Sequence, residues 1–330
     1  MKYLVTGVAG FIGMHLAIRL LKEGHEVVGI DNLNDYYSLS LKLARLDNIQ
    51  NQTEPKDYSR FRFEKIDLSD LTNSSFLCDR FDGLFHLAAQ AGVRYSLENP
   101  MQYIQSNIIG FQRIIDFVVK NEIKYFFYAS SSSVYGRSSE VPFREDMICN
   151  SPESLYAATK MSNELVASSY FNTHGVTSVG LRFFTVYGPW GRPDMAPMIF
   201  TKAALGNEPI ELFNYGKQYR DFTYIDDIIE GIVLLSRQTF LEGAHIFNIG
   251  NGEPVLLFDF VSLIEEKLNR KLNVSLKPAQ PGDVDRTSAD VKKLYSITKF
   301  KPSVSLTYGL DRFLKWYLDY NQILSNLDQK

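Results

Sequence analysis

Tyr156 and Lys160 are the two side chains in this sequence whose types and spacing best suit proton transfer. They lie near the start of a helix predicted over Leu155–Phe171, and a separation of four residues places both on one face. A tyrosine ordinarily keeps its proton up to about pH 10. A nearby ammonium favours the phenolate, so we expect Lys160 to lower the pKa of Tyr156 and let it act as a general base. A chance pair on a helix surface is the alternative.

A run of serines is the second candidate for chemistry. It occupies residues 130–133 and follows Lys124–Ala129, which is predicted to be a strand. A hydroxyl just beyond the end of a strand could share the reacting oxygen of a substrate with Tyr156. Ser131 is the first candidate for this role, and Ser132 and Ser133 remain alternatives because the run blurs the register.

Glycines recur every third residue near the N-terminus, at Gly7, Gly10 and Gly13. They follow a predicted strand, Lys2–Thr6, and precede a helix predicted over His15–Glu23. Such glycines allow a tight turn and a close backbone approach to a pyrophosphate, which binds at the positive N-terminus of the helix. The pattern predicts a dinucleotide-binding loop, and an ordinary glycine-rich turn is the alternative.

An acidic residue stands where a ribose-binding carboxylate is expected. A second predicted strand, Glu26–Ile30, ends at Asp31, which lies eighteen residues after Gly13. That spacing suits an acid that accepts hydrogen bonds from ribose hydroxyls. The carboxylate would repel a 2′-phosphate, so the sequence favours NAD over NADP as the cofactor.

Two further strand ends add to this predicted site. Arg60–Asp67 alternates as a strand does, and Asp67 either contacts the adenine amino group or caps a helix over Ser69–Phe76. Gly83–Ala89 runs into small residues that would let the backbone approach the cofactor, and we expect His86 to be a packed strand residue. The predicted cofactor-binding residues are Gly7, Gly10, Phe11, Ile12, Gly13, Asp31, Asn32, Asp67, Leu68, Leu87, Ala88, Ala89, Tyr156 and Lys160.

Strands and helices alternate through the first half of the chain, which predicts an α/β fold with a Rossmann-type, doubly wound parallel sheet. Further helices are predicted over Ser38–Leu46 and Gln102–Val119, and a further strand over Thr177–Arg182. In such sheets ligands bind beyond the carboxyl ends of the strands, where all of the segments above end.

The alternation breaks after Tyr187, where turn-rich segments begin. We therefore expect residues 1–188 to form the NAD-binding domain with the Tyr156/Lys160 helix. Residues 189–330 are expected to form a smaller C-terminal substrate-binding lobe that is interleaved with the sheet. The later elements are predicted over Met198–Leu205, Ile225–Ser236, Ala244–Ile249, Phe258–Leu268 and Leu306–Asn321.

Composition excludes several classes of protein. The formal net charge of −3 over 330 residues offers no basic field for nucleic acid. Cys78 and Cys149 are the two cysteines, too few for a disulfide framework, so we expect a cytoplasmic protein. No apolar run approaches 18 residues and Met1 leads directly into the first strand, so neither a membrane span nor a signal peptide is expected. No metal site is expected.

Together these segments resemble the extended short-chain dehydrogenase/reductase family over almost the whole chain. Within it, segments 88–96, 182–196 and 220–227 make the sequence most similar to the nucleotide-sugar 4-epimerases that act on UDP-glucuronate. The resemblance matches the cofactor loop to Gly7, Gly10 and Gly13, and the catalytic trio to Ser131, Tyr156 and Lys160. It also implies a homodimer, built from the helices around Gln102–Val119 and Leu155–Phe171.

The resemblance also implies a UDP-sugar site. Arg192 resembles the family's nucleotide-binding arginine and Arg220 its pyrophosphate-binding arginine, whereas Thr185 stands where UDP-glucose epimerases carry asparagine. Asp283 follows a Pro-Gly turn, and Arg286, three residues later, belongs either to the uridine end of the site or to the surface. The implied substrate-binding residues are Arg94, Ser131, Ser132, Ser133, Thr185, Arg192, Arg220 and Asp283.

The function that this resemblance implies is NAD-dependent 4-epimerisation of UDP-glucuronate to UDP-galacturonate through a transient 4-keto sugar. Ser131–Ser133 and Thr185 are the residues expected to bind the sugar carboxylate. UDP-glucose 4-epimerase and UDP-glucuronate decarboxylase are the alternatives on the same scaffold. A non-catalytic NAD-binding protein is a third, which the presence of Tyr156 and Lys160 argues against.

Overall fold

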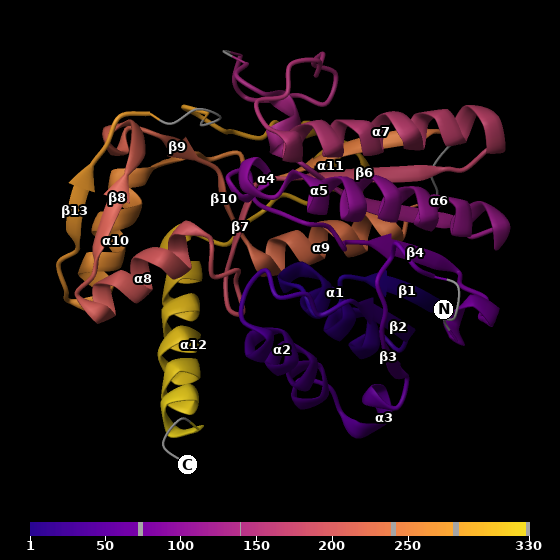
Figure 1. Cartoon of the computed structure of the whole chain (residues 1–330), viewed down its shortest axis with the longest axis horizontal. Coiled ribbons are helices and arrows are strands. Elements are labelled where there is room, and N and C mark those ends of the chain that lie inside the picture. The colour runs from indigo at the N-terminus through magenta and orange to yellow at the C-terminus, as the bar shows by residue number, and fades with distance from the viewer. Residues whose placement is uncertain (72–74, 139, 239–241, 280–283, 328–330) are drawn as a thin grey trace.

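In the computed structural model of this chain, the largest element is a seven-stranded sheet in the order β11-β6-β5-β4-β1-β2-β3 (Figure 1). All of its neighbouring strands pair in parallel, which confirms the predicted doubly wound α/β fold. The strands are β1 Lys2–Thr6, β2 Glu26–Asp31, β3 Phe61–Lys65, β4 Gly83–His86, β5 Tyr125–Ser131, β6 Ser178–Phe183 and β11 Ala244–Ile249. The structure describes residues 1–71, 75–138, 140–238, 242–279 and 284–327, with the backbone alone for 322–327.

Helices cover both faces of this sheet (Figure 1). One face is covered by α1 Phe11–Lys22, which packs against α2 Leu39–Asn51 and α9 Ile225–Ser236. The other face is covered by α6 Gly110–Lys120 and α7 Leu155–His174, which pack against each other. The short helices α3 Pro55–Tyr58, α4 Tyr95–Glu98 and α5 Pro100–Tyr103 lie in the connections.

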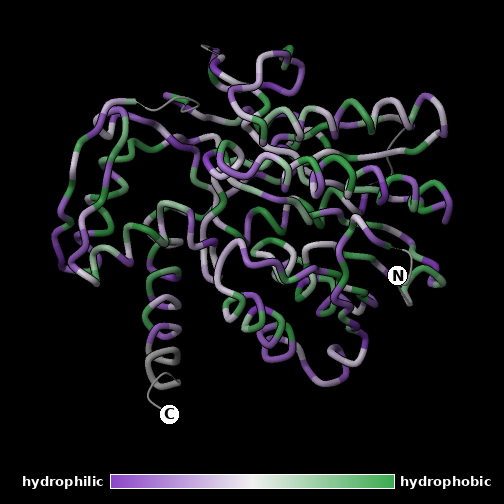
Figure 2. The backbone as a smooth tube through the Cα atoms, viewed as in Figure 1, coloured by the Kyte–Doolittle hydropathy of each residue, from purple (hydrophilic) through white to green (hydrophobic). Residues whose placement is uncertain are grey.

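Strand β1 illustrates why the sheet needs helices on both sides. Tyr3 and Val5 pack in the core cluster that includes α1 and α9, whereas Leu4 packs in the cluster that includes α6. Successive side chains of a strand point to opposite faces, so an apolar run of this kind is buried on both. Figure 2 shows the complementary pattern, in which the covering helices carry both hydrophobic and hydrophilic residues.

The smaller lobe contains three two-stranded sheets. Thr185–Tyr187 (β7) pairs in parallel with Phe222–Tyr224 (β10), and Pro209–Leu212 (β8) with Asn273–Leu276 (β13). Its other described elements are β9 Tyr219–Arg220, β12 Val255–Leu256, α8 Ala196–Gly206, α10 Leu257–Leu268 and α12 Leu306–Leu327, whereas α11 Lys292–Thr298 packs against α9 and β11 at the large sheet. The division of the chain at residue 188 stays a prediction, and β11 and α9 return from the later half to the large sheet.

Two predicted helices differ from the observed structure. The helix predicted over Gln102–Val119 is a succession of α5, a π-helical stretch η2 (Ile104–Ile109) and α6. The α-helix predicted over Ser69–Phe76 is wrong for its described residues, which hold a turn and the start of a 3₁₀ helix, η1 (Ser75–Cys78). Asp67 accepts hydrogen bonds from the backbone N–H and the hydroxyl of Ser69, which closes a local turn in place of a helix cap. Further 3₁₀ turns are η3 Ser132–Tyr135 and η4 Phe213–Gly216.

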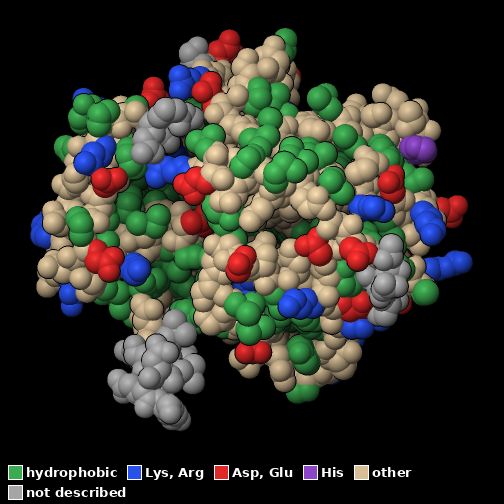
Figure 3. Space-filling view, viewed as in Figure 1, with side chains coloured by type: hydrophobic (Ala, Val, Ile, Leu, Met, Phe, Trp, Pro, Cys, Tyr) green, Lys and Arg blue, Asp and Glu red, His purple; other side chains and the backbone are tan. Residues whose placement is uncertain are grey.

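The surface is mixed in character (Figure 3). No helix among the described residues is long and apolar enough to cross a membrane. Figure 3 shows hydrophobic side chains gathered over α4, α5 and α7, with charged side chains around them. Leu97 of α4, Met101 of α5 and Leu165 of α7 are each more than 60% exposed there.

A buried ion pair joins α7 to β6. The Arg182 guanidinium donates to both carboxylate oxygens of Glu164, and Ser130 of β5 donates to the same carboxylate. The two charged side chains are only 5% and 12% exposed. Because both groups are buried, removing one charge would leave the other unpaired in the interior, which lowers the stability of the fold.

Arg182→Met should therefore lower the free energy of unfolding by about 3–5 kcal/mol, because it leaves the Glu164 carboxylate without its partner. Arg144→Met is the matched control, since Arg144 is half exposed and pairs with Glu140 and Asp146 at the surface. The control should lose less than about 1 kcal/mol. Urea unfolding of the three proteins measures both values, and equal losses would contradict the structural role of the buried pair.

Candidate active site

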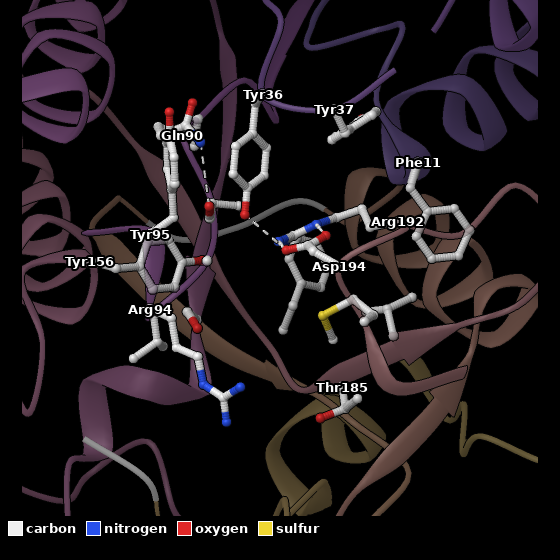
Figure 4. A pocket seen from close by; sticks show the side chains of 18 of the residues that line it. Phe11, Tyr36, Tyr37, Gln90, Arg94, Tyr95, Tyr156, Thr185, Arg192 and Asp194 are labelled. Carbon is white, nitrogen blue, oxygen red and sulfur yellow. Dashed lines mark hydrogen bonds and ion pairs between the residues drawn. The ribbon is translucent and has the colours of Figure 1, made fainter. Parts of the chain in front are cut away.

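One pocket, with a volume of about 1290 Å³, lies between the carboxyl ends of the large sheet and the smaller lobe. Figure 4 shows several of its side chains converging on the centre. The predicted site residues that line it are Gly7, Gly10, Phe11, Ile12, Gly13, Asp31, Asn32, Asp67, Leu68, Leu87, Ala88, Ala89, Arg94, Ser131, Ser132, Ser133, Tyr156, Lys160, Thr185, Arg192 and Arg220. Asp283 lies outside the described residues. The pocket is larger than most small-molecule sites, and its size suits a cofactor together with a substrate.

The glycine loop forms the turn from β1 into α1. Gly7 has a φ of +72°, and its carbonyl accepts a hydrogen bond from the Gly10 N–H at 2.9 Å. A Cβ added to Gly13 would lie 2.1 Å from that carbonyl oxygen, so a side chain cannot be accommodated there. The first turn of α1 contains no acidic residue. Its N-terminal N–H groups therefore suit a bound pyrophosphate, and that role of the loop stays a prediction.

Asp31 lies at the end of β2, next to the glycine loop. Its carboxylate accepts hydrogen bonds from the N–H groups of Ala9 at 3.2 Å and Leu33 at 2.9 Å. Burial raises the pKa of Asp31, and these two hydrogen bonds act in the opposite direction. Nearby, Asn32 donates to Asp67 at 2.9 Å, so the polar residues at the ends of β2 and β3 form one cluster. These groups fit the adenosine half of a dinucleotide.

His86 is a packed strand residue, as predicted. It is 3% exposed, and its Nδ1 lies 2.9 Å from the hydroxyl of Thr6 on the neighbouring strand. The same hydroxyl accepts a hydrogen bond from the Ala88 N–H, which fixes the small residues after β4 against the glycine loop. Burial lowers the pKa of His86 to about 3, so the ring stays neutral and serves the packing of the strands.

Tyr156 and Lys160 lie in the first turns of α7, whose N-terminus is capped by Ser154. The ammonium of Lys160 donates to the carbonyl of Ala129 at the end of β5, at 2.8 Å. Burial lowers the pKa of Lys160 to about 8. Burial raises the pKa of Tyr156, while Arg192 and a hydrogen bond with Ser131 lower it. The cation that acts on Tyr156 in this structure is therefore Arg192, and the expected effect of Lys160 stays a prediction.

The structure distinguishes the serines of the run by their surroundings. Ser131 is buried at the end of β5, where it lies against Tyr156 and accepts a hydrogen bond from the Ser133 N–H. Ser132 and Ser133 are partly exposed in the 3₁₀ turn η3 that follows. This arrangement favours Ser131 over its neighbours as the partner of the tyrosine.

The centre of the pocket holds a group of side chains that the sequence reasoning did not assign. Tyr36 donates a hydrogen bond to Asp194 at 2.9 Å, and Asp194 in turn pairs with Arg192 (Figure 4). Tyr36 also lies 4.7 Å from Tyr95, measured between ring centroids. The group connects the loop after β2 to the loop after β7, two segments about 150 residues apart in the chain. The adjacent tyrosines at residues 36–37 are the one feature of the sequence that could have drawn attention to Tyr36. They do not indicate that its hydrogen-bond partner is Asp194.

The other predicted substrate residues lie on the side of the smaller lobe. Thr185 begins β7 and is held by a bond from its N–H to the Asp221 carbonyl at 3.0 Å. The guanidinium of Arg94 lies 4.5 Å from the centre of the Phe213 ring, and that of Arg220 donates to the Tyr219 carbonyl. Arg286 is exposed, stacks on the Tyr219 ring and does not line the pocket, which fits the surface alternative. Among the described residues there is no cluster of His, Cys, Asp and Glu that could hold a metal ion.

The sequence matches the family described as NAD dependent epimerase/dehydratase over residues 3–250. A probable UDP-glucuronate 4-epimerase of Rhizobium meliloti is 41% identical, over 96% of this chain and 97% of that protein. Protein CapI of Staphylococcus aureus is 45% identical, over 97% and 99%. The crystal structure of UDP-glucuronic acid 4-epimerase from Bacillus cereus, in complex with UDP-glucuronic acid and NAD, superposes with a TM-score of 0.90. It is 35% identical and covers 97% of this chain and all of that one.

The lowered pKa of Lys160 predicts a specific pH dependence of stability. The unfolded lysine titrates near its ordinary value of 10.5 and the folded one near 8, so the unfolded chain binds more protons between these values. Stability relative to Lys160→Met should therefore rise as the pH increases from about 8 toward 10.5. Urea unfolding of both ligand-free proteins across this range measures the difference. A difference that stays constant with pH would contradict a buried, readily deprotonated lysine.

Proposed function

This chain belongs to the NAD dependent epimerase/dehydratase family, and we propose that it converts UDP-glucuronate to UDP-galacturonate by NAD-dependent 4-epimerisation. The observation that carries the proposal is the gathering of the glycine loop, the Ser131/Tyr156/Lys160 trio and Thr185 in one pocket. The similarity to an epimerase crystallised with UDP-glucuronic acid and NAD supports the same substrate and cofactor.

The residues around the glycine loop fit NAD. The N-terminus of α1 would hold the pyrophosphate, and the Asp31 carboxylate would accept hydrogen bonds from the ribose hydroxyls in exchange for those of the backbone. When bound, NAD supplies a reversible hydride acceptor, so that loss and return of hydride at C4 leave no net oxidation. A cycle of this kind favours a cofactor that stays bound between turnovers.

Tyr156 is the proposed base. As a phenolate it takes the proton of the C4 hydroxyl while that carbon loses hydride, and it returns the proton after the 4-keto sugar has turned over. The Ser131 hydroxyl stabilises both the phenolate and the reacting oxygen by hydrogen bonding. Because enclosure raises the pKa of Tyr156, positive charge from Arg192, Lys160 and the oxidised nicotinamide is needed for it to ionise near neutral pH.

Rotation of the sugar requires that binding energy come mostly from the UDP part. Arg220 and Arg94 lie on the side of the smaller lobe, where guanidinium groups can clamp the pyrophosphate. Arg192, proposed from the sequence as a nucleotide-binding residue, lies in the same pocket as Tyr156 and lowers the pKa of that tyrosine. The position of Arg192 therefore suits a role near the reacting carbon at least as well as a role in binding the nucleotide.

The sugar carboxylate is the feature that separates this substrate from UDP-glucose. A 4-keto uronic acid is a β-keto acid, which loses CO₂ readily. We propose that the hydroxyls of Ser131–Ser133 and Thr185 bind the carboxylate and hold the C5–carboxyl bond away from the geometry that favours its loss. The residues before Val134 are serines and carry no carboxylate that could serve as a further acid or base.

A homodimer in the cytoplasm remains part of the proposal. Exposed apolar residues on α4, α5 and α7 support a second copy as the partner, because a monomer gains nothing by exposing them together. Light scattering of the purified protein would measure the oligomeric state directly.

Product analysis tests the proposed function. The purified protein is incubated with UDP-glucuronate and no added cofactor, and the products are separated by chromatography. UDP-galacturonate supports the proposal. UDP-xylose with CO₂ identifies a decarboxylase, and turnover of UDP-glucose to UDP-galactose with none of UDP-glucuronate identifies a UDP-glucose epimerase. Absence of turnover with both sugars would support the non-catalytic alternative.

Tyr156→Phe should lower turnover by about 10²–10⁴-fold, because it removes the general base while keeping the ring. Binding of UDP-glucuronate should be largely kept, since the hydroxyl serves the reaction more than the binding. Turnover is measured by product formation and binding by calorimetry. A loss smaller than tenfold would remove Tyr156 from its proposed role.

Thr185→Val should cost more with UDP-glucuronate than with UDP-glucose. A site built to hydrogen-bond a group loses most with the substrate that carries this group. Some 4-keto intermediate should also decarboxylate and appear as a UDP-pentose. Thr173→Val, at the exposed end of α7, is the matched control and should change neither rate. Equal losses on both sugars would contradict the carboxylate assignment.

A further inference from the structure

The turn Pro189–Gly191 is held by hydrogen bonds to three consecutive carbonyl oxygens. Nε2 of His15, on α1, lies 3.1 Å from the Pro189 oxygen. One terminal nitrogen of the Arg45 guanidinium, on α2, donates to the oxygens of Trp190 at 2.8 Å and Gly191 at 3.0 Å. All three oxygens belong to the loop that leads into the smaller lobe, whereas both donors belong to helices of the large sheet.

Arg45 is an unusual residue to find in the interior. Its side chain is completely buried, although a guanidinium stays charged at any ordinary pH. None of the ion pairs between described residues includes it. Its five N–H groups are matched by five hydrogen bonds, and the remaining ones go to the Ala9 carbonyl, the Tyr37 hydroxyl and, from Nε, Trp190. A buried cation of this kind needs every donor satisfied, so the carbonyls around it are fixed in place.

The backbone of the turn also depends on its surroundings. Trp190 has a φ of +66°, which is rare for a bulky side chain and persists only where neighbouring contacts maintain it. Its ring lies 5.3 Å from the rings of Trp316 and Tyr320 on α12. Arg45 and His15 thus hold the carbonyls on one side, and α12 holds the ring on the other.

Two functional segments meet at Arg45. Ala9, whose carbonyl it binds, lies inside the glycine loop between Gly7 and Gly10. Gly191 is followed directly by Arg192, which lines the same pocket as Tyr156 and pairs there with Asp194. The Arg45 guanidinium therefore connects the cofactor loop to the turn that carries Arg192.

We propose that Arg45, assisted by His15, is a positioning residue that fixes the turn directly before Arg192, and so sets the place of Arg192 in the pocket and ties it to the glycine loop. The role in turnover rests on the proposed epimerisation. His15 is suited to its part because burial lowers its pKa to about 4, so that it remains a neutral ring with its proton on Nε2, toward the carbonyl.

The first test is a double-mutant cycle with UDP-glucuronate. Arg45→Met should lower kcat/KM by about 100-fold, the scale expected when a reacting constellation is displaced by about 1 Å. In an Arg192→Ala background the same substitution should cost no more than about twofold, because its effect is transmitted through Arg192. Arg45→Lys keeps the charge and some of the hydrogen bonds, so its kcat/KM should lie between those of the wild type and Arg45→Met. Arg270→Met, at an exposed arginine, is the control and should leave kcat/KM unchanged. Equal factors for Arg45→Met in both backgrounds would overturn the proposal.

A second readout does not depend on turnover. Amide hydrogen exchange over residues 190–195 should be faster in Arg45→Met than in Arg270→Met, while exchange in the strands of the large sheet stays the same. Unchanged exchange in the turn would overturn the proposal even if activity falls. If the protein shows no activity with UDP-glucuronate, the proposed function fails while this measurement still decides the role of Arg45. Should Arg45→Met fail to fold, His15→Phe removes one carbonyl contact and carries both tests.

Discussion

The turn between β1 and α1 is packed so closely, both against the residues after β4 and within itself, that Gly7 and Gly13 cannot carry side chains. A Cβ on Gly7 would lie 2.7 Å from the Ala88 nitrogen, and one on Gly13 would lie 2.1 Å from the Gly7 oxygen. This contact brings the N-terminus of α1 to the point where the strand order of the sheet reverses, between β1 and β4. The cofactor loop, Asp31 and Ala88 converge there because the strands are parallel and their carboxyl ends meet at one edge.

Burial then determines how the charged groups behave. Lys160 loses solvent and its pKa falls to about 8, while the pKa of Tyr156 rises for the same reason. Arg192 cannot lose its proton, so it remains a fixed positive charge in the same pocket as the tyrosine. The pocket therefore holds a tyrosine that ionises only when enough positive charge surrounds it, and a bound oxidised cofactor would add to that charge. The ability of Tyr156 to act as a base therefore depends on whether the oxidised cofactor is bound.

The sequence was sufficient to predict the fold and most of the residues that line the candidate pocket, because both rest on local patterns. Strand runs, the glycine spacing and the Tyr156–Lys160 separation each occupy a short window, and the strand ends locate the pocket. The Ser69–Phe76 helix failed because Asp67 bonds locally to Ser69 in a way that helix propensity does not reveal. Tyr36, Asp194 and Arg45 were missed for another reason. Their partners lie some 145 to 158 residues away, and no periodicity connects them.

The central claim is that one bound cofactor removes and returns the same hydride at C4 of the sugar, with Tyr156 moving the proton. Incubation with UDP-glucuronate that carries deuterium at C4, without added NAD, tests it directly. The account predicts UDP-galacturonate with the deuterium retained at C4, as observed by mass spectrometry and proton NMR. Replacement of the deuterium by hydrogen from the solvent would contradict it.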